Sequence, residues 1–163
     1  MSTLAKRPLL GRALKRAPGE RRTEYLAFRL GSDTYGVRIE SIAEILKPPP
    51  ITPIPRAPGI VLGIMSVRGR LVTVMDLRAR FGHATATLGR RTRILLTEVR
   101  GETLGVVVDE VRQVYRLGES EIEPAAALGS DQPSYVIGVG RPKEDGAPGD
   151  IVVLLDLGET IRT

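Results

Sequence analysis

The stretch YLAFRLGSDTYGVRIESIAEI, residues 25–45, recurs further along the chain as ILLTEVRGETLGVVVDEVRQV, residues 94–114. At this offset of 69 residues, apolar side chains coincide along both stretches and Gly36 aligns with Gly105. Each copy is typical of a strand, a tight turn, a second strand and a short segment with apolar residues three apart. Self-similarity at one spacing indicates a duplicated structural unit.

The similarity continues in the same order beyond these stretches. VLGIM (61–65) resembles VIGVG (136–140), and VTVMDLRARF (72–81) resembles VVLLDLGETI (152–161). A unit of about five strands is too small to bury a good core alone, so we expect the two halves to pack together or exchange strands. Short antiparallel strands curl into a small barrel and close most exposed edges. The sequence therefore predicts an all-β domain of two small barrels with short helices.

Each half is predicted to end in a short helix. Asp76 stands between VTVM and LRARF, where its carboxylate suits the N-cap position, and Asp156 has the same place before LGETI. Gly82 follows the first helix as a natural stop. Helix capping explains both aspartates without a catalytic role.

The composition excludes several kinds of chemistry. The 163 residues include no Cys, which rules out disulfides, thiolate metal sites and a cysteine nucleophile. The only histidine, His83, is expected in an exposed loop, and carboxylates are scattered singly through turns and helix starts. We therefore expect no enzymatic activity, no cofactor and no metal. No apolar window approaches the ~20 residues of a membrane span, and no secretory signal is visible, so a cytoplasmic location is predicted.

The positive charge is concentrated at the N-terminus. Residues 1–22 hold seven basic side chains against one acidic side chain, whereas the remainder is close to neutral. We assign residues 1–22 as a basic tail, expected to be disordered, and residues 23–163 as the folded domain. Alternatively, the tail is an electrostatic arm for nucleic acid, an acidic membrane surface or an acidic partner.

Two further segments stand out between the repeated pieces. The run KPPPITPIPRAPG, residues 47–59, predicts a rigid strap, because so many prolines remove hydrogen-bond donors; a polyproline ligand is the alternative. The stretch LGIMSVRGRLVTVMDL, residues 62–77, predicts a hairpin with Arg68 and Gly69 at its tip. Gly69 supplies the positive φ of a tight turn. Nothing in the turn explains Arg68, which makes it a candidate contact for a partner.

Over about residues 23–162, these segments resemble the CheW-type adaptors of bacterial chemotaxis, and GIMSVRGRLVTVMDLR is the most specific part. The resemblance implies a CheW-like fold of two intertwined five-stranded, SH3-like barrels and no enzymatic activity. It also implies a role in coupling the helical-hairpin tip of a methyl-accepting chemoreceptor to the histidine kinase CheA, in ring assemblies within cytoplasmic receptor arrays.

By matching position, the resemblance also implies two binding surfaces. The receptor groove between the barrels would be lined by Ile42, Glu44, Gly63, Ser66, Arg68 and Val114. The kinase would contact Ile39, Ile45 and Leu46. The family usually has Asn-Leu-Arg-Gly at the hairpin tip, where this chain has Ser66-Val67-Arg68-Gly69, so a different receptor preference is expected.

Two other functions stay open. A CheW-like paralogue could recruit a receptor without engaging the kinase, and it would then leave kinase activity unchanged. A nucleic-acid-associated small-barrel protein would act through its basic tail and lose binding when residues 1–22 are deleted. The neutral body and the scarcity of aromatic side chains favour the adaptor.

Overall fold

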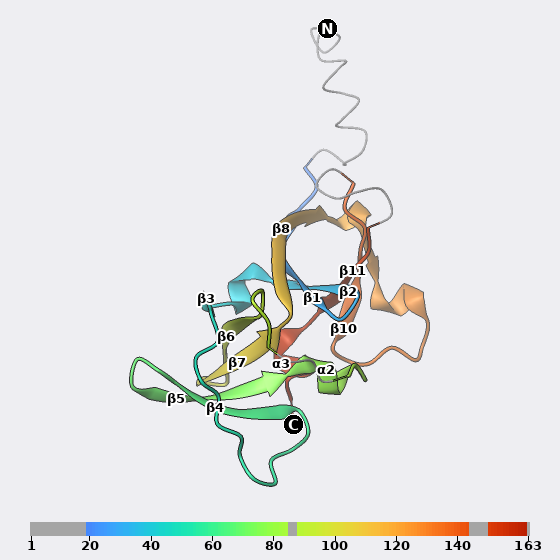
Figure 1. Cartoon of the computed structure of the whole chain (residues 1–163). Coiled ribbons are helices and arrows are strands. Elements are labelled where there is room, and N and C mark those ends of the chain that lie inside the picture. The colour runs from blue at the N-terminus through green and yellow to red at the C-terminus, as the bar shows by residue number, and fades with distance from the viewer. Residues whose placement is uncertain (1–18, 85–87, 144–149, 163) are drawn as a thin grey trace, which may run out of the picture.

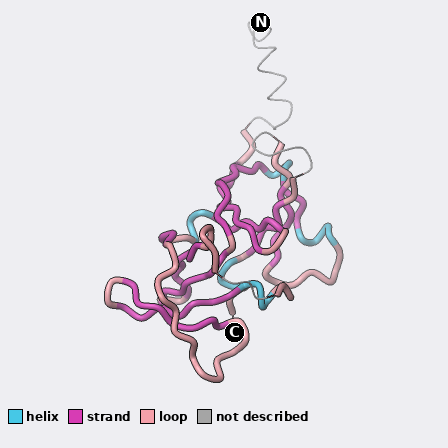
Figure 2. The backbone as a smooth tube through the Cα atoms, viewed as in Figure 1, coloured by secondary structure: helices cyan, strands magenta, loops and turns pink. Residues whose placement is uncertain are grey.

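A computed structural model describes residues 19–84, 88–143 and 150–162 of the chain. These residues form two β-sheets, each rolled into a small barrel, with short helical turns between strands (Figure 1). The first sheet is seen almost end-on as a ring of strands in Figure 2. No helix within the described residues is both long and apolar enough to span a bilayer.

The first sheet has six strands in the order β8-β1-β2-β11-β10-β9, and the second has five in the order β3-β6-β7-β5-β4. The strands of the first sheet are β1 (Arg22–Leu30), β2 (Asp33–Arg38), β8 (Glu110–Gly118), β9 (Ile122–Pro124), β10 (Val136–Gly140) and β11 (Val152–Leu155). Those of the second are β3 (Glu44–Leu46), β4 (Val61–Val67), β5 (Arg70–Asp76), β6 (Arg93–Val99) and β7 (Glu102–Val108). The helical turns are η2 (Ile39–Ser41), α2 (Leu77–Arg80), η3 (Glu119–Glu121), η4 (Ala125–Leu128) and α3 (Leu157–Thr160).

Each barrel is built from both halves of the sequence. The N-terminal hairpin β1–β2 joins the barrel of the second half, through a parallel pairing of β2 with β11. In return, the hairpin β6–β7 joins the barrel of the first half, through a parallel pairing of β7 with β5. The exchange covers both edges of each hairpin with strands of the other half, because β1 also pairs with β8 and β6 also pairs with β3. The halves therefore exchange strands, and the prediction of intertwined barrels is confirmed.

The duplication appears as pseudo-two-fold symmetry in the strand register. Gly36 of β2 pairs with Leu154 of β11, and the equivalent Gly105 of β7 pairs with Val74 of β5. A Cβ atom at Gly105 would lie 2.9 Å from side-chain atoms inside the second barrel. Glycine at this position therefore allows the barrel interior to close.

The two halves differ at the edge of each sheet. In the second half, β9 pairs with β10 and adds a sixth strand to the first sheet. In the first half, the proline-rich strap makes only the single bridge of Thr52 with Ile64, whose backbone N–H and C=O groups exchange two hydrogen bonds of 2.8 Å. Proline lacks the N–H group that a longer strand would need, so the strap stays extended but mostly unpaired.

The two barrels share a core at their junction. Each barrel encloses its own apolar cluster, and a larger junction cluster takes side chains from both sheets, including Leu26 and Leu95. Four of the six aromatic side chains stack in a column there. Their ring centroids are 6.1 Å apart for Phe28–Tyr35, 4.8 Å for Tyr35–Phe81 and 5.7 Å for Phe81–Tyr135. Burial of this shared surface stabilises the two barrels as one unit.

Both predicted helix caps are confirmed. Asp76 Oδ1 accepts a hydrogen bond of 3.0 Å from the backbone N–H of Arg78, and Asp156 Oδ1 accepts one of 3.0 Å from that of Glu159. Gly82 follows α2 with a φ of 75°, the left-handed conformation of a helix stop.

The predicted boundary after residue 22 falls at the first strand of the described chain. Arg22, the last residue assigned to the basic tail, is the first residue of β1, and its Nη1 donates to Glu121 Oε1 at 2.9 Å. Two residues earlier, Glu20 Oε2 accepts a hydrogen bond of 2.5 Å from the N–H of Ser120. Residues 1–18 of the predicted tail lie outside the described residues.

Candidate protein-interaction surface

The tip of the β4–β5 hairpin holds Arg68 in a defined position. Arg68 has a φ of 49° and Gly69 a φ of 80°, the left-handed pair typical of a type I′ turn. Arg68 Nη2 donates to Glu44 Oε2 at 2.5 Å, across 24 residues of sequence. This hydrogen bond raises the pKa of the Arg68 guanidinium above its ordinary value. Because left-handed backbone disfavours side chains such as arginine, the turn alone gives no reason for arginine at this position.

A groove of about 460 Å³ lies between this tip and the turn that joins β6 to β7. Arg68 and Arg70 line one side of the groove, together with Leu71, which is 75% exposed. Glu102 lines it from the neighbouring hairpin. Of the predicted site residues, Arg68 alone lines this groove. An exposed leucine next to two arginines suits contact with another protein.

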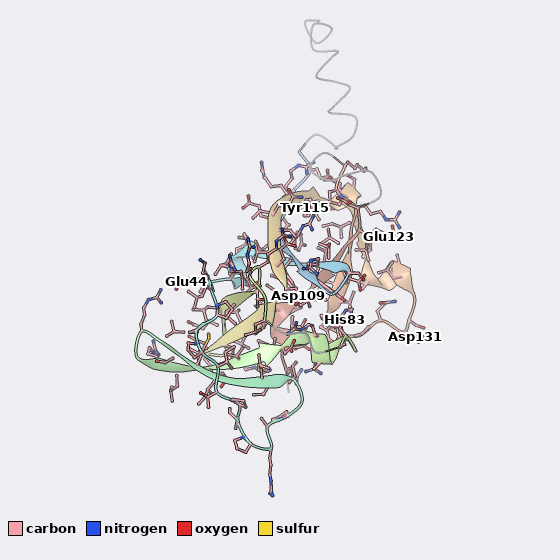
Figure 3. All side chains as sticks on the ribbon, viewed as in Figure 1. Glu44, His83, Asp109, Tyr115, Glu123 and Asp131 are labelled. Atoms are coloured by element: carbon pink, nitrogen blue, oxygen red, sulfur yellow. The ribbon has the colours of Figure 1, made fainter. Side chains whose placement is uncertain are left out.

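Two segments carry the chain from one barrel to the other. Residues 39–46 lead from β2 into β3, and residues 108–115 lead from β7 into β8. The repeat relates these two segments, and Ile42 of the first and Val111 of the second both pack against the junction cluster. In Figure 3, Glu44 and Asp109 mark the two segments. We call the surface that residues 39–46 and 108–115 form the crossover face.

Equivalent apolar residues line the crossover face. Ile42 and Val111 are half-buried against the junction cluster. Ile45 of β3 and Val114 of β8 are each 42% exposed, on the edge strands of different barrels. The resemblance assigns Ile45 to the kinase and Val114 to the receptor, but the repeat makes the two positions equivalent. The face thus offers apolar contacts on both sides of the pseudo-two-fold axis.

The remaining predicted contacts differ in exposure. Ser66 is exposed on β4, whereas Ile39 and Leu46 are half-buried, against the junction cluster and the core of the second barrel respectively. Gly63 is buried, and a Cβ atom there would overlap the backbone carbonyl of Thr52. Gly63 therefore has a packing role, because it lets the strap lie directly against β4.

Sequence reasoning missed a buried ion network. Arg78 is 2% exposed; its Nε lies 3.0 Å from Asp76 Oδ1, and its Nη1 lies 2.8 Å from Asp109 Oδ1. Asp109 Oδ2 also accepts a hydrogen bond of 2.7 Å from the N–H of Gly31. The close spacing of Asp76 and Arg78 in the sequence could have predicted the ion pair between them. Nothing in the sequence signalled Asp109.

His83 lies in a loop, as predicted, but its side chain is half-buried and not exposed. Its side chain is 25% exposed, and its Nε2 lies 3.2 Å from Tyr35 Oη and 3.7 Å from Asp33 Oδ2. Burial raises the pKa of the Tyr35 hydroxyl above its ordinary value. His83 thus covers one side of the aromatic column.

Within the described ranges, no three His, Asp or Glu side chains are grouped to hold a metal ion.

Comparisons with known proteins agree with this architecture. The CheW-like domain matches residues 24–163. "Chemotaxis protein CheW" of Rhizobium meliloti is 33% identical over 117 residues, which cover 71% of this chain and 76% of the relative. "Protein FrzA" of Myxococcus xanthus is 31% identical over 116 residues, covering 71% and 72%. The crystal structure of the scaffolding protein TtCheW from Thermoanaerobacter tengcongensis has a TM-score of 0.75 and 27% identity, and the match covers 88% of this chain and 94% of that one. The predicted resemblance is confirmed.

Proposed function

Because the chain belongs to the CheW-like family, we propose that it is a non-enzymatic adaptor that couples chemoreceptor tips to a CheA-type histidine kinase. It would act in the cytoplasm, within receptor arrays that control motility. The observation that carries this proposal is the family match over residues 24–163, which spans both intertwined barrels.

The crossover face supports the receptor part of the proposal. Ile42 and Val114 supply apolar surface that a receptor helix can bury, and such burial provides most of the contact energy of a protein interface. Arg68 is held toward this surface by Glu44, which belongs to the crossover face. A guanidinium has several donors in one plane and keeps donors free for a partner after bonding one carboxylate. Arg68 would therefore set register and specificity.

The edge strand β3 supports the kinase part. Ile45 is exposed on this strand, while Leu46 and Ile39 support it from half-buried positions. By the resemblance, the regulatory domain of the kinase has the same fold. An edge strand with an exposed apolar side chain suits a partner domain of that kind, because its unpaired backbone groups are available for pairing.

The test combines binding and kinase activity, using the full chain. The protein, a soluble chemoreceptor hairpin and the CheA regulatory domain should elute as one complex in size-exclusion chromatography, and Arg68→Glu should lose the receptor. Arg56→Glu is the matched control, since Arg56 is also an exposed arginine with positive φ, in the strap. The control should keep the complex. Addition of the protein to receptor-containing membranes should raise CheA autophosphorylation.

Other outcomes identify the alternatives. Receptor binding without an effect on kinase activity would indicate a receptor-specific paralogue. Binding to nucleic acid instead of receptor, lost when residues 1–22 are deleted and steeply weakened by salt, would favour the nucleic-acid-associated protein.

A further inference from the structure

Charges on the crossover face break its pseudo-two-fold symmetry. Three guanidinium groups converge on the carboxylate of Glu110, at the start of β8. Arg29 Nε lies 3.2 Å and Arg112 Nη1 lies 4.0 Å from Glu110 Oε1. Arg91 Nη1 lies 3.4 Å from Glu110 Oε2. One carboxylate thus faces three positive charges, and we call these three arginines the basic rim.

Two of the three arginines of the basic rim have no positive counterpart on the other half. With the repeat offset, the counterparts of Arg29 and Arg112 are Glu98 and Ala43, and that of Glu110 is Ser41. The counterpart of Arg91 is Arg22, whose side chain is 14% exposed and is bound by Glu121. The two acidic side chains of residues 39–46 each have one basic partner. Glu40 lies 3.8 Å from Arg38, and Glu44 is bound to Arg68. The apolar residues of the crossover face are therefore symmetric, whereas its charges are not.

Neighbouring groups leave an excess of positive charge beside Glu110. Asp109 lies 3.9 Å from Arg29, but its other oxygen is bound by Arg78, which Asp76 also binds. Four arginines here face three carboxylates, counting these buried groups. Residues 88–97, which include Arg91, contain two further arginines and no acidic side chain. The basic rim is therefore not neutralised by its own surroundings.

Two members of the basic rim are accessible to a partner. The side chains of Arg91 and Arg112 are 75% and 51% exposed, and both guanidinium groups lie beside the carboxylate of Glu110. Each guanidinium has five N–H donors, so contact with Glu110 leaves donors directed elsewhere. A second carboxylate placed between them would form charge-assisted hydrogen bonds with both.

We propose that the basic rim binds an acidic side chain on one helix of the chemoreceptor hairpin and thereby selects one of two docking orientations. This inference rests on the proposed function. The apolar residues of the crossover face are equivalent on its two sides, so apolar contacts alone distinguish the two orientations poorly. Ion pairs formed on one side only favour a single orientation, because the reversed hairpin places its carboxylate near Glu98.

The test is a titration of the full chain with a soluble chemoreceptor hairpin from the same organism. Fluorescence anisotropy measures the Kd of the complex at two salt concentrations. The double variant Arg91→Glu/Arg112→Glu should raise the Kd at least about tenfold at low salt, and should lose most of the salt dependence of binding. Arg91→Gln/Arg112→Gln should give a smaller loss. Arg141→Glu, the same change at an exposed position after β10, should stay within about twofold.

A charge exchange identifies the partner side chain. Replacing each Asp and Glu of the hairpin tip in turn by Lys should find one change that weakens binding to the unmodified protein and restores binding to Arg91→Glu/Arg112→Glu. If the double variant binds like the unmodified protein, the inference is wrong and the proposed function stands. If the unmodified protein binds no receptor hairpin, both the inference and the proposed function are wrong.

Discussion

Arg78 and Asp109 form a part-buried ion pair at the crossover between the two barrels. Arg78 Nη1, from α2 at the end of β5, donates to Asp109 Oδ1 at 2.8 Å, where the chain passes from β7 into β8. Arg78 also bonds Asp76, the N-cap of its own helix. The corresponding position in the second half is Gly158, so only one of the two terminal helices makes this link.

Replacing Arg78 by Met should destabilise the protein strongly. Met keeps much of the side-chain bulk but leaves Asp76 and Asp109 without their shared cation, and breaking a buried pair in this way costs about 3 kcal/mol or more of unfolding free energy. Urea denaturation followed by circular dichroism measures the change. Arg116→Met, whose side chain is 64% exposed, should change the unfolding free energy by less than about 0.5 kcal/mol. Similar losses for both variants would contradict a special role for the buried pair.

Arg68 should matter for binding and not for folding. Arg68→Gly removes the ion pair with Glu44, which is exposed and contributes little to stability, and it places glycine where φ is 49°. The thermal midpoint of the variant should equal or exceed that of the unmodified protein, whereas its affinity for the receptor hairpin should fall. Glu44→Gln, which keeps Arg68, should bind better than Arg68→Gly. A variant that is both less stable and fully able to bind would refute this assignment.

Gly63→Ala should displace the strap from β4. The added methyl group would overlap the Thr52 carbonyl, which also accepts the N–H of Ile64, so the backbone has to shift. Overpacking of this kind costs about 2 kcal/mol. Gly89→Ala is the matched control, because its Cβ would meet only Thr92 Oγ1, at 3.9 Å. Chemical denaturation of both variants should show a lower free energy of unfolding for Gly63→Ala alone. Equal free energies would show that the strap can move away from β4 without cost.

Glu20 should make stability depend on pH in the acid range. The hydrogen bond from the Ser120 N–H lowers the pKa of Glu20 from its ordinary value of 4.5, so the folded protein favours the ionised form. This stabilisation is present above about pH 4.5 and is lost as the pH falls through the lowered pKa. Glu20→Gln should therefore be less stable than the unmodified protein at pH 6, and the difference should shrink toward pH 3.

Denaturation at both pH values measures this difference. Glu119→Gln, which changes the same type of side chain at an exposed position on η3, is the matched control. A constant difference for Glu20→Gln would contradict the role of the hydrogen bond from Ser120.

The sequence by itself determined the local elements and the duplication. The repeat of residues 25–45 at 94–114 predicted the strands, Gly69 predicted the tip of the hairpin, and Asp76 and Asp156 predicted the helix caps. The turn and the helix caps each depend on residues within a few positions of one another, so the residue types carry the necessary information. The repeat also made residues 39–46 and 108–115 equivalent, although that equivalence gains meaning only in the folded protein.

Only the tertiary structure decided what the long-range contacts are. The sequence allowed the halves to pack or to exchange strands, and the parallel pairings of β2 with β11 and β5 with β7 decided for exchange. The same exchange brings Arg78 to Asp109, seats His83 over Tyr35 and gathers Arg29, Arg91 and Arg112 around Glu110. Such contacts join residues tens of positions apart, so they depend on which strands pack together when apolar surface is buried.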